Sequence, residues 1–185
     1  MKPKIAIILG DKQEFSAIIR VTDILDRFKI PYSVNICSAY QSPNELQEYI
    51  NKINSCDACK VVIAASSMSE ALPGIIASKT NKPVIGLPLS AHPIISSNSI
   101  NSMAAMLSML QMPVGTPVLT VGIDNPKNAA LAAARIVALS NAEVACHLEA
   151  YRISRRAFTN SDNSNLREKK HEPFDTAALK YKCEF

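Results

Sequence analysis

Tryptophan is absent from the sequence, aromatic residues make up only 5% of it, and its 185 residues include only five glycines. With so few aromatic side chains and a main body close to neutral, the chain has no footprint for nucleic acid. So few glycines also make it difficult to build a loop of backbone amides that closely surrounds a phosphate. No apolar run reaches the roughly 20 residues that a membrane-spanning helix needs. We therefore expect neither nucleic acid nor a membrane as a partner.

The first residues lack the long apolar stretch and the small-residue cleavage site of a signal peptide, so we expect a cytoplasmic protein. The five cysteines are an odd, scattered number, which argues against a disulfide framework. Only Cys56 and Cys59 are close together, in a C-x-x-C pattern. Zinc is not expected because a second ligand pair is missing, and a redox pair would follow a strand rather than precede one. We interpret the two as ordinary thiols near a helix end, with the redox interpretation as the alternative.

Apolar residues make up 48% of the chain and charged residues 19%, a composition that supports one domain with a sizeable core and excludes global disorder. The net charge of +4 is concentrated near the C-terminus. Its basic residues there are Arg152, Arg155, Arg156, Lys169 and Lys170. Such a run is more typical of a solvated surface than of a functional site.

Short apolar runs alternate with segments of helical periodicity along the chain. We expect strands at 4–10, 32–38, 60–65, 83–87 and 118–123. We expect helices at 14–29, 43–53, 72–80, 103–110 and 128–145, the last running on toward residue 156. Ser42, with Pro43 and Glu45 after it, has the pattern of a helix N-cap. The alternation predicts an α/β fold, a three-layer αβα sandwich with a parallel sheet of the flavodoxin-like or Rossmann-like type.

The periodicity fades after residue 158. We therefore expect an α/β domain over 1–158 and a polar, basic C-terminal extension over 159–185, extended or partly disordered. In parallel sheets, ligands bind beyond the carboxyl ends of the strands. Here those ends lead into residues 10–14, 38–41, 65–71 and 87–92.

Several motifs, in order over residues 4–155, resemble one family. They are IAIILG, SAY-x-SP, VVIAA, ALPGIIASKTNKPVIGLPL, QMPVGTPV and NAALAAARI. They are similar to the carboxyaminoimidazole ribonucleotide mutases and aminoimidazole ribonucleotide carboxylases (PurE type) of purine synthesis, and the chain is identified as a divergent member. For an active protein, the resemblance implies a mutase (isomerase) or carboxylase (lyase) activity. We expect no cofactor and no metal.

The family also assembles as octamers through the helices around LPG and the long C-terminal helix. Those stretches are retained here, so the resemblance predicts a homo-octamer. Met103, Met106, Met109 and Met112 recur every three residues and are expected in the core or in subunit contacts.

The first motif of the family is a glycine-serine-lysine-serine-aspartate loop that holds the ribose phosphate. Here the loop reads GDKQE, from Gly10 to Glu14. Both serines are gone, and the carboxylate of Asp11 competes with phosphate for the anion site at a helix N-terminus. Lys12 is retained, and Glu14 replaces the aspartate that reaches a ribose hydroxyl.

The second motif, serine-alanine-histidine-arginine-threonine-proline, reads SAYQSP here, from Ser38 to Pro43. Tyr40 replaces the proton-shuttling histidine, and a phenol with a pKa of about 10 is a poor base at neutral pH. Gln41 replaces the arginine that neutralises phosphate, and glutamine makes no charge-assisted bidentate contact.

The third motif has a glycine pair and a second histidine before LPG. Here Ser66, Ser67 and Met68 replace the glycines, and Ala71 stands in place of the histidine. His92 lies in a short insertion beyond a predicted strand end, where it is a candidate substitute acid or base; the alternative is an ordinary surface histidine.

The matching positions give the candidate site. The candidate ligand-binding residues are Gly10, Asp11, Gln13, Glu14, Ser38, Ala39, Tyr40, Gln41, Ser66, Ser67, Ala71 and Leu72. Tyr40 and His92 are the candidate catalytic residues, and no metal site is expected.

The residues of the family's site are replaced here, whereas its packing motifs are retained. This combination leads to three hypotheses. The first is a catalytically silent or repurposed homologue whose small-molecule ligand is less anionic than a ribonucleotide, since Asp11, Glu14 and Glu70 favour an amine or a cation. The second is a genuine though atypical mutase or carboxylase in purine biosynthesis. The third is a scaffold or regulatory subunit of a mixed oligomer.

Overall fold

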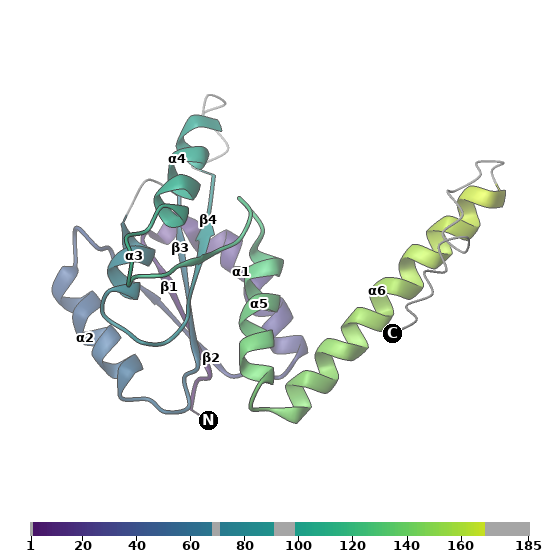
Figure 1. The fold of residues 1–185 in the computed structure, drawn as a ribbon, viewed down its shortest axis with the longest axis horizontal. Coiled ribbons are helices and arrows are strands. Elements are labelled where there is room, and N and C mark those ends of the chain that lie inside the picture. Colours follow the sequence, from purple (N-terminus) through teal and green to yellow (C-terminus); the bar gives the residue numbers. More distant parts are fainter. Residues whose placement is uncertain (1, 68–70, 91–98, 169–185) are drawn as a thin grey trace, which may run out of the picture. The chain divides into compact units, whose positions relative to one another are not determined.

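The structure is a computed structural model, and it describes residues 2–67, 71–90 and 99–168 (Figure 1). Strands and helices alternate over most of this length. In chain order the elements are β1 (Ile5–Leu9), the 3₁₀ turn η1 (Lys12–Glu14), α1 (Phe15–Arg27), β2 (Tyr32–Ile36), α2 (Pro43–Asn54), β3 (Val61–Ser66), α3 (Leu72–Ala77), β4 (Val84–Pro88), α4 (Ser99–Leu110), β5 (Leu119–Thr120), α5 (Pro126–Ala138) and α6 (Ala142–Glu168).

The strands form one parallel sheet with the order β2-β1-β3-β4-β5. This order is the flavodoxin-like one, so the α/β fold class predicted from the sequence is confirmed. From β1 the chain moves to one side of the sheet to form β2, and then to the other side to form β3. Ligands of such sheets bind at this change of direction, beyond the carboxyl ends of β1 and β3.

Helices cover both faces of the sheet: α1 and α5 lie on one face, and α2, α3 and α4 lie on the other (Figure 1). β1, β3 and β4 are buried along their whole length, as expected for strands covered on both faces. Alternate residues serve the two layers; Ala6 and Ile8 of β1, for example, pack with Leu46, Ile50 and Ile76 of α2 and α3. The apolar runs in the sequence are therefore the inner strands of a three-layer core.

The expected continuous helix from residue 128 onward is instead two helices, α5 and α6, separated at residues 139–141. Asn141 explains the restart, because its Oδ1 accepts a hydrogen bond from Val144 N at 3.1 Å and its carbonyl accepts one from Ala145 N at 3.1 Å. This is an N-cap, which an alanine-rich periodicity does not reveal. β5 is also shorter than expected: it ends at Thr120, and a turn at Asp124, whose φ is 50°, follows before α5.

The described residues divide into two compact units, with the boundary between Leu148 and Glu149. In the second, α6 continues to Glu168, so residues 159–168 of the expected extension are helical. Residues 169–185 lie outside the described part of the chain. Arg152 pairs with Glu149 at 2.7 Å between Nη2 and Oε1, an exposed contact within one helix. The domain boundary at residue 158 stays a prediction.

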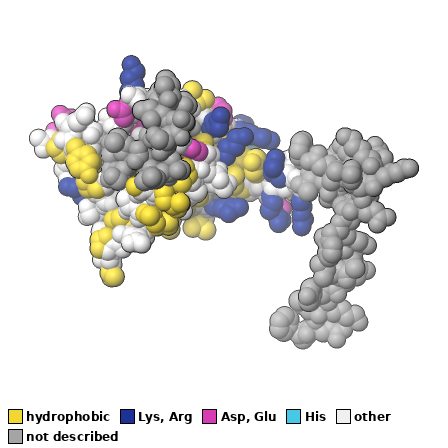
Figure 2. All heavy atoms as spheres, turned by 90° about the horizontal axis from the view of Figure 1, so that it is seen from above, with side chains coloured by type: hydrophobic (Ala, Val, Ile, Leu, Met, Phe, Trp, Pro, Cys, Tyr) yellow, Lys and Arg dark blue, Asp and Glu magenta, His cyan; other side chains and the backbone are white. Residues whose placement is uncertain are grey.

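Exposed apolar side chains are present on the α/β unit. Figure 2 shows hydrophobic side chains standing among scattered acidic and basic ones on the face seen from above. Met103, Leu107 and Leu110 of α4 are 49%, 45% and 54% exposed, whereas Met109 of the same helix is 1% exposed. The methionine repeat therefore does not lie on one side of α4. Among the described helices, none combines the length and the apolar character needed to cross a membrane.

Candidate functional site

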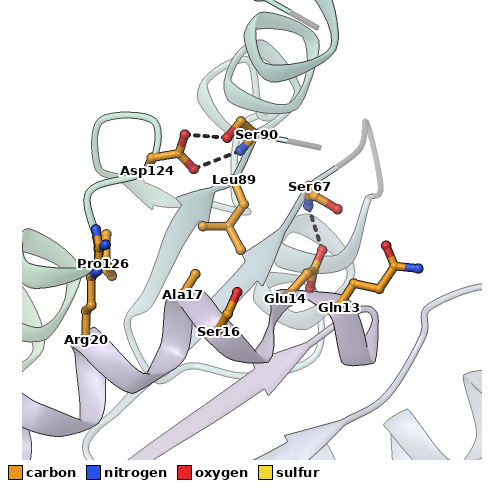
Figure 3. A pocket seen from close by; sticks show the side chains of 10 residues that line it. All are labelled: Gln13, Glu14, Ser16, Ala17, Arg20, Ser67, Leu89, Ser90, Asp124 and Pro126. Carbon is orange, nitrogen blue, oxygen red and sulfur yellow. Dashed lines mark hydrogen bonds between the residues drawn. The ribbon is translucent and has the colours of Figure 1, made fainter. Parts of the chain in front are cut away.

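A cleft of about 570 Å³ opens at the carboxyl end of the sheet (Figure 3). The first turns of α1 form one wall, the ends of β3 and β4 form the floor, and the loop before α5 forms the opposite wall. The lining residues are Gln13, Glu14, Ser16, Ala17, Arg20, Ser67, Leu89, Ser90, Asp124 and Pro126. Of the candidates from the sequence, Gln13, Glu14 and Ser67 are among them.

The carboxylate of Glu14 lies at the change of direction between β1 and β3. Its Oε2 accepts hydrogen bonds from Gly10 N at 3.0 Å and from Asp11 N at 3.3 Å, both directly after β1. Its Oε1 accepts one from Ser67 N at 2.7 Å, directly after β3. The side chain is only 5% exposed. One carboxylate thus joins the ends of two neighbouring strands and uses the amides that face the cleft there.

The local sequence explains how Glu14 reaches this position. Asp11 caps η1, with its Oδ1 accepting a hydrogen bond from Gln13 N at 2.7 Å, and Glu14 returns a bond to the Asp11 amide. This reciprocal pair is a capping box, formed by an acidic or hydroxyl residue and a glutamate three positions later. The GDKQE loop is therefore held closed by its own two carboxylates.

Burial raises the pKa of the Glu14 carboxyl above its ordinary value of 4.5. Removal from water is the largest cause, and it is opposed by hydrogen bonds from Ser67 and from the Asp11 and Gly10 amides. A carboxyl group of this kind takes up a proton more readily than an exposed one. It can therefore act as an acid or a base at the edge of the cleft.

Asp124 holds the opposite wall of the cleft in place. Its Oδ1 accepts a hydrogen bond from Ser90 N at 2.9 Å, and its Oδ2 accepts one from the Ser90 hydroxyl (Figure 3). Its own amide donates to Pro88 O at 3.0 Å. These bonds tie the loop before α5 to the end of β4. Our sequence analysis missed Asp124, although its place between a strand and Pro126 was a usable signal.

Arg20 supplies the positive charge of the cleft lining, against the carboxylates of Glu14 and Asp124. It lies on the same side of α1 as Ser16 and Ala17, whose small side chains leave the cleft open (Figure 3). The sequence analysis also missed Arg20, because helical periodicity alone does not say which polar positions face a cleft.

The loop of the second motif does not line the cleft. Ser38 Oγ accepts hydrogen bonds from Tyr40 N at 3.3 Å and Gln41 N at 3.2 Å, and the Tyr40 side chain is 65% exposed. Ser42 Oγ accepts a bond from Ser38 N at 3.0 Å and donates to Ser38 O at 3.2 Å. Ser42 therefore stabilises this loop, and the expectation that its side chain caps α2 is wrong.

The third motif is divided between core and surface. Ser66 and Leu72 are fully buried, whereas Ala71 is exposed. Ala39, from the second motif, is 9% exposed. Leu72 packs in the core with α2 and α3 rather than in the cleft lining. Met68, Glu70 and the candidate acid or base His92 lie outside the described residues.

The cleft lining contains no histidine among the residues that the structure describes. His147, the described histidine, lies at the far end of α1, where its Nδ1 is 3.0 Å from Phe28 O and its ring stacks on Phe28. In the same part of the chain, no cluster of three or more histidine, cysteine or carboxylate side chains is arranged to hold a metal ion.

Comparison with known proteins identifies the family. The profile of the AIR carboxylase family matches residues 4–157. The N5-carboxyaminoimidazole ribonucleotide mutase of Pyrococcus horikoshii is 40% identical over 150 residues, which cover 81% of each chain. That of Saccharolobus solfataricus is 37% identical, over 77% of this chain and 86% of the relative.

Solved structures agree with the sequence relatives. The crystal structure of Treponema denticola PurE superposes with a TM-score of 0.78 at 27% identity, covering 89% of this chain and 99% of that one. The fold, the order of motifs and the curated relatives lead to the same conclusion, as the sequence resemblance predicted. The chain belongs to the AIR carboxylase family.

Proposed function

We propose that this chain is a repurposed member of the family that does not carry out the mutase reaction and binds a small ligand less anionic than a ribonucleotide. The observation that carries this proposal is the position of Glu14. Its buried carboxylate accepts hydrogen bonds from the amides of Gly10 and Asp11, directly after β1, and of Ser67, directly after β3.

The charge of the cleft supports a ligand without a phosphate dianion. Among the lining residues that the structure describes, two carboxylates, Glu14 and Asp124, stand against one guanidinium, that of Arg20. A phosphate at the carboxyl ends of β1 and β3 would be repelled by the Glu14 carboxylate. The backbone amides there already donate to Glu14 and are not available to the phosphate. A polyol or an amine meets acceptors at both carboxylates and has no such conflict.

The proton-transfer groups of the family also have no counterpart among the described lining residues. Tyr40 replaces the first histidine, and its side chain points to solvent outside the cleft lining. Ala71 replaces the second and carries no titratable group. Without an acid and a base at the substrate's imidazole carbon, we expect turnover to fall by several orders of magnitude.

The direct test is turnover of carboxyaminoimidazole ribonucleotide, with the Pyrococcus horikoshii mutase as the active control. We expect no product above background from the full chain, and weaker binding of ribose 5-phosphate than of ribose by calorimetry. Product formation would overturn the silent assignment. Preference for the phosphorylated sugar would overturn the proposed ligand class, independently of catalysis.

An atypical mutase is the second candidate, favoured by 40% identity to a relative named as a mutase. In that case Glu14, with its raised pKa, is the described acid or base of the cleft. The two candidates differ in the effect of Glu14→Gln. A genuine mutase would lose activity with this variant and keep it with Glu48→Gln, which changes an exposed glutamate of α2.

We further propose that the chain forms a homo-octamer in the cytoplasm. The exposed apolar side chains of Met103, Leu107 and Leu110 on α4 support assembly, since a face of this kind is more stable when covered. A scaffold role in a mixed oligomer is the third candidate. Co-purification with an intact homologue would distinguish it from a homo-oligomer.

A further inference from the structure

The C-x-x-C sequence forms a tight turn between α2 and β3. Cys59 N donates a hydrogen bond to Cys56 O at 3.0 Å, so the two cysteines are the first and fourth residues of a β-turn. The end Cα atoms of a β-turn lie within about 7 Å of each other. Disulfides join cysteines whose Cα atoms are about 4.4–6.8 Å apart. The backbone therefore already brings the two residues within bridging range.

The two side chains also contact the same apolar cluster. Cys59 is 2% exposed and belongs to the apolar cluster under α2 and α3, and Cys56 packs against that same cluster while remaining partly exposed. The two thiols are close enough to interact electrostatically, and the pKa of Cys59 is raised mainly by burial. The turn and the shared cluster thus hold the two thiols near each other in the folded protein.

Lys82, two residues before β4, contacts both ends of this turn. Its Nζ donates hydrogen bonds to Cys56 O at 3.2 Å and to Cys59 O at 2.8 Å. The ammonium group also lowers the pKa of Cys59, in opposition to burial. Burial outweighs this effect, so Lys82 offsets only part of the rise in the pKa of Cys59. Its ammonium group still lies at the turn, where it can attract a thiolate that forms during disulfide exchange.

We propose that Cys56 and Cys59 are a reversible redox site that a small-molecule disulfide, such as oxidised glutathione, converts to an intramolecular disulfide. The more accessible Cys56 loses a proton and attacks one sulfur of the small disulfide, which releases one small thiolate and leaves a mixed disulfide. The Cys59 thiolate then attacks Cys56 Sγ and releases the second small thiolate. Two protein thiols are oxidised, one small disulfide is reduced to two thiols, and the released protons balance the two thiolates.

This inference is independent of the proposed function, because the turn lies at the amino end of β3, away from the cleft at the carboxyl ends. The proposal chooses the redox interpretation, which was the alternative in the sequence analysis. The position of the motif disfavoured a redox pair, because such pairs usually begin a helix after a strand, and this one precedes a strand. Here a β-turn and a lysine take the place of the helix start, and only the folded structure brings Lys82 to the pair.

The test equilibrates the full chain in mixtures from fully reduced to fully oxidised glutathione, followed by alkylation and mass spectrometry of the peptides. We expect Cys56 and Cys59 to lose alkylation together, in a linked peptide that carries no glutathione. Retention of glutathione on Cys56 in the unmutated chain would overturn the proposal. So would two thiols that remain reduced in the oxidised mixture.

Variants separate the two steps. Cys59→Ala should trap glutathione on Cys56, and Cys56→Ala should abolish the disulfide and leave Cys59 unmodified because it is buried. Lys82→Met should slow the second step, so that the mixed disulfide accumulates. Lys79→Met is its matched control, since Lys79 bonds to Gln47 instead. Equal behaviour of the two lysine variants would contradict the role of Lys82, and the experiment on the unmutated chain decides the site even if a cysteine variant does not fold.

Discussion

At the scale of single residues, the Glu14 carboxylate joins the ends of two neighbouring strands, β1 and β3. It satisfies backbone amides after β1 and β3 and so closes the ends of both strands. A buried amide that loses its acceptor costs about 1–3 kcal/mol. The same side chain therefore shapes the candidate site and stabilises the fold around it.

Removal of this carboxylate should destabilise the protein. We expect Glu14→Ala to lower the free energy of unfolding by about 1–3 kcal/mol, because the Gly10 and Ser67 amides lose their acceptor. Glu48→Ala, at an exposed position of α2, is the control and should change it by less than about 0.5 kcal/mol. Urea unfolding measures both; equal effects would show that the Glu14 bonds contribute nothing specific.

The raised pKa of Glu14 also predicts a pH dependence. Because burial raises its folded-state pKa above the ordinary 4.5, the folded protein binds this proton more tightly than the unfolded chain. Its contribution to stability is complete below pH 4.5 and is lost as the pH rises through the folded-state pKa. The difference in melting temperature between the unmutated chain and Glu14→Gln isolates this group from other carboxylates. As the pH rises through this window, we expect the melting temperature of the unmutated chain to fall relative to that of Glu14→Gln. A difference that does not change with pH would contradict the prediction.

Gln13, which lines the cleft, allows the ligand class to be tested by gain of function. If the cleft lacks the positive charge that a phosphate needs, Gln13→Arg should raise the affinity for ribose 5-phosphate by about tenfold, from one or two charge-assisted hydrogen bonds. Gln111→Arg adds the same charge at an exposed position after α4 and is the control. Calorimetry compares them. An equal gain in affinity in both variants would show that the added net charge, and not a contact in the site, is the cause.

At the scale of elements, β4 and the segment after α4 pack closely because residue 86 has no side chain. A Cβ atom there would lie 2.9 Å from Val118 Cγ1 and 3.0 Å from Met109 Sδ. We expect Gly86→Ala to lower the free energy of unfolding by about 1–3 kcal/mol, since the neighbours must move. Gly122→Ala, where the nearest atom is 4.0 Å away, is the control and should change it much less. Urea titration of both variants distinguishes close packing from a general loss of glycine.

The restart of the helix after α5 depends on one cap. Asn141 accepts hydrogen bonds at the start of α6, and Asn141→Ala should lower the free energy of unfolding by about 1 kcal/mol. Asn44→Ala, at an exposed position in the first turn of α2, serves as the comparison. Circular dichroism during urea unfolding reports both. A neutral Asn141 variant would mean that packing alone divides the two helices.

At the scale of the whole molecule, the exposed α4 residues predict an assembly. We expect light scattering to give the mass of a homo-octamer for the unmutated chain. Leu107→Glu places a charge in the apolar face and should shift the mass to smaller species, whereas Asn44→Glu adds the same charge on α2 and should not. A stable monomer would refute the assembly. A Leu107→Glu octamer would place the interface elsewhere.

Much of the architecture can be predicted from patterns of neighbouring residues in the sequence. The apolar runs of β1, β3 and β4 and the periodicity of α1 and α2 predict a covered parallel sheet, because each pattern depends on residues only a few positions apart. The capping box of Asp11 and Glu14 is local for the same reason, since the two residues are three positions apart. Helical periodicity does not predict the break at Asn141, where a cap interrupts an otherwise uniform helical pattern.

The tertiary structure alone decided which of these residues meet. Glu14 bonds to the Ser67 amide across 53 positions of the chain, and Asp124 bonds to Ser90 across 34. Arg20 faces the same cleft only because of how α1 is rotated on the sheet, and Tyr40 is directed to solvent by the loop that Ser42 closes. Contacts of this kind depend on strand order and helix rotation, which the packing of the whole core determines. Local periodicity carries no information about them.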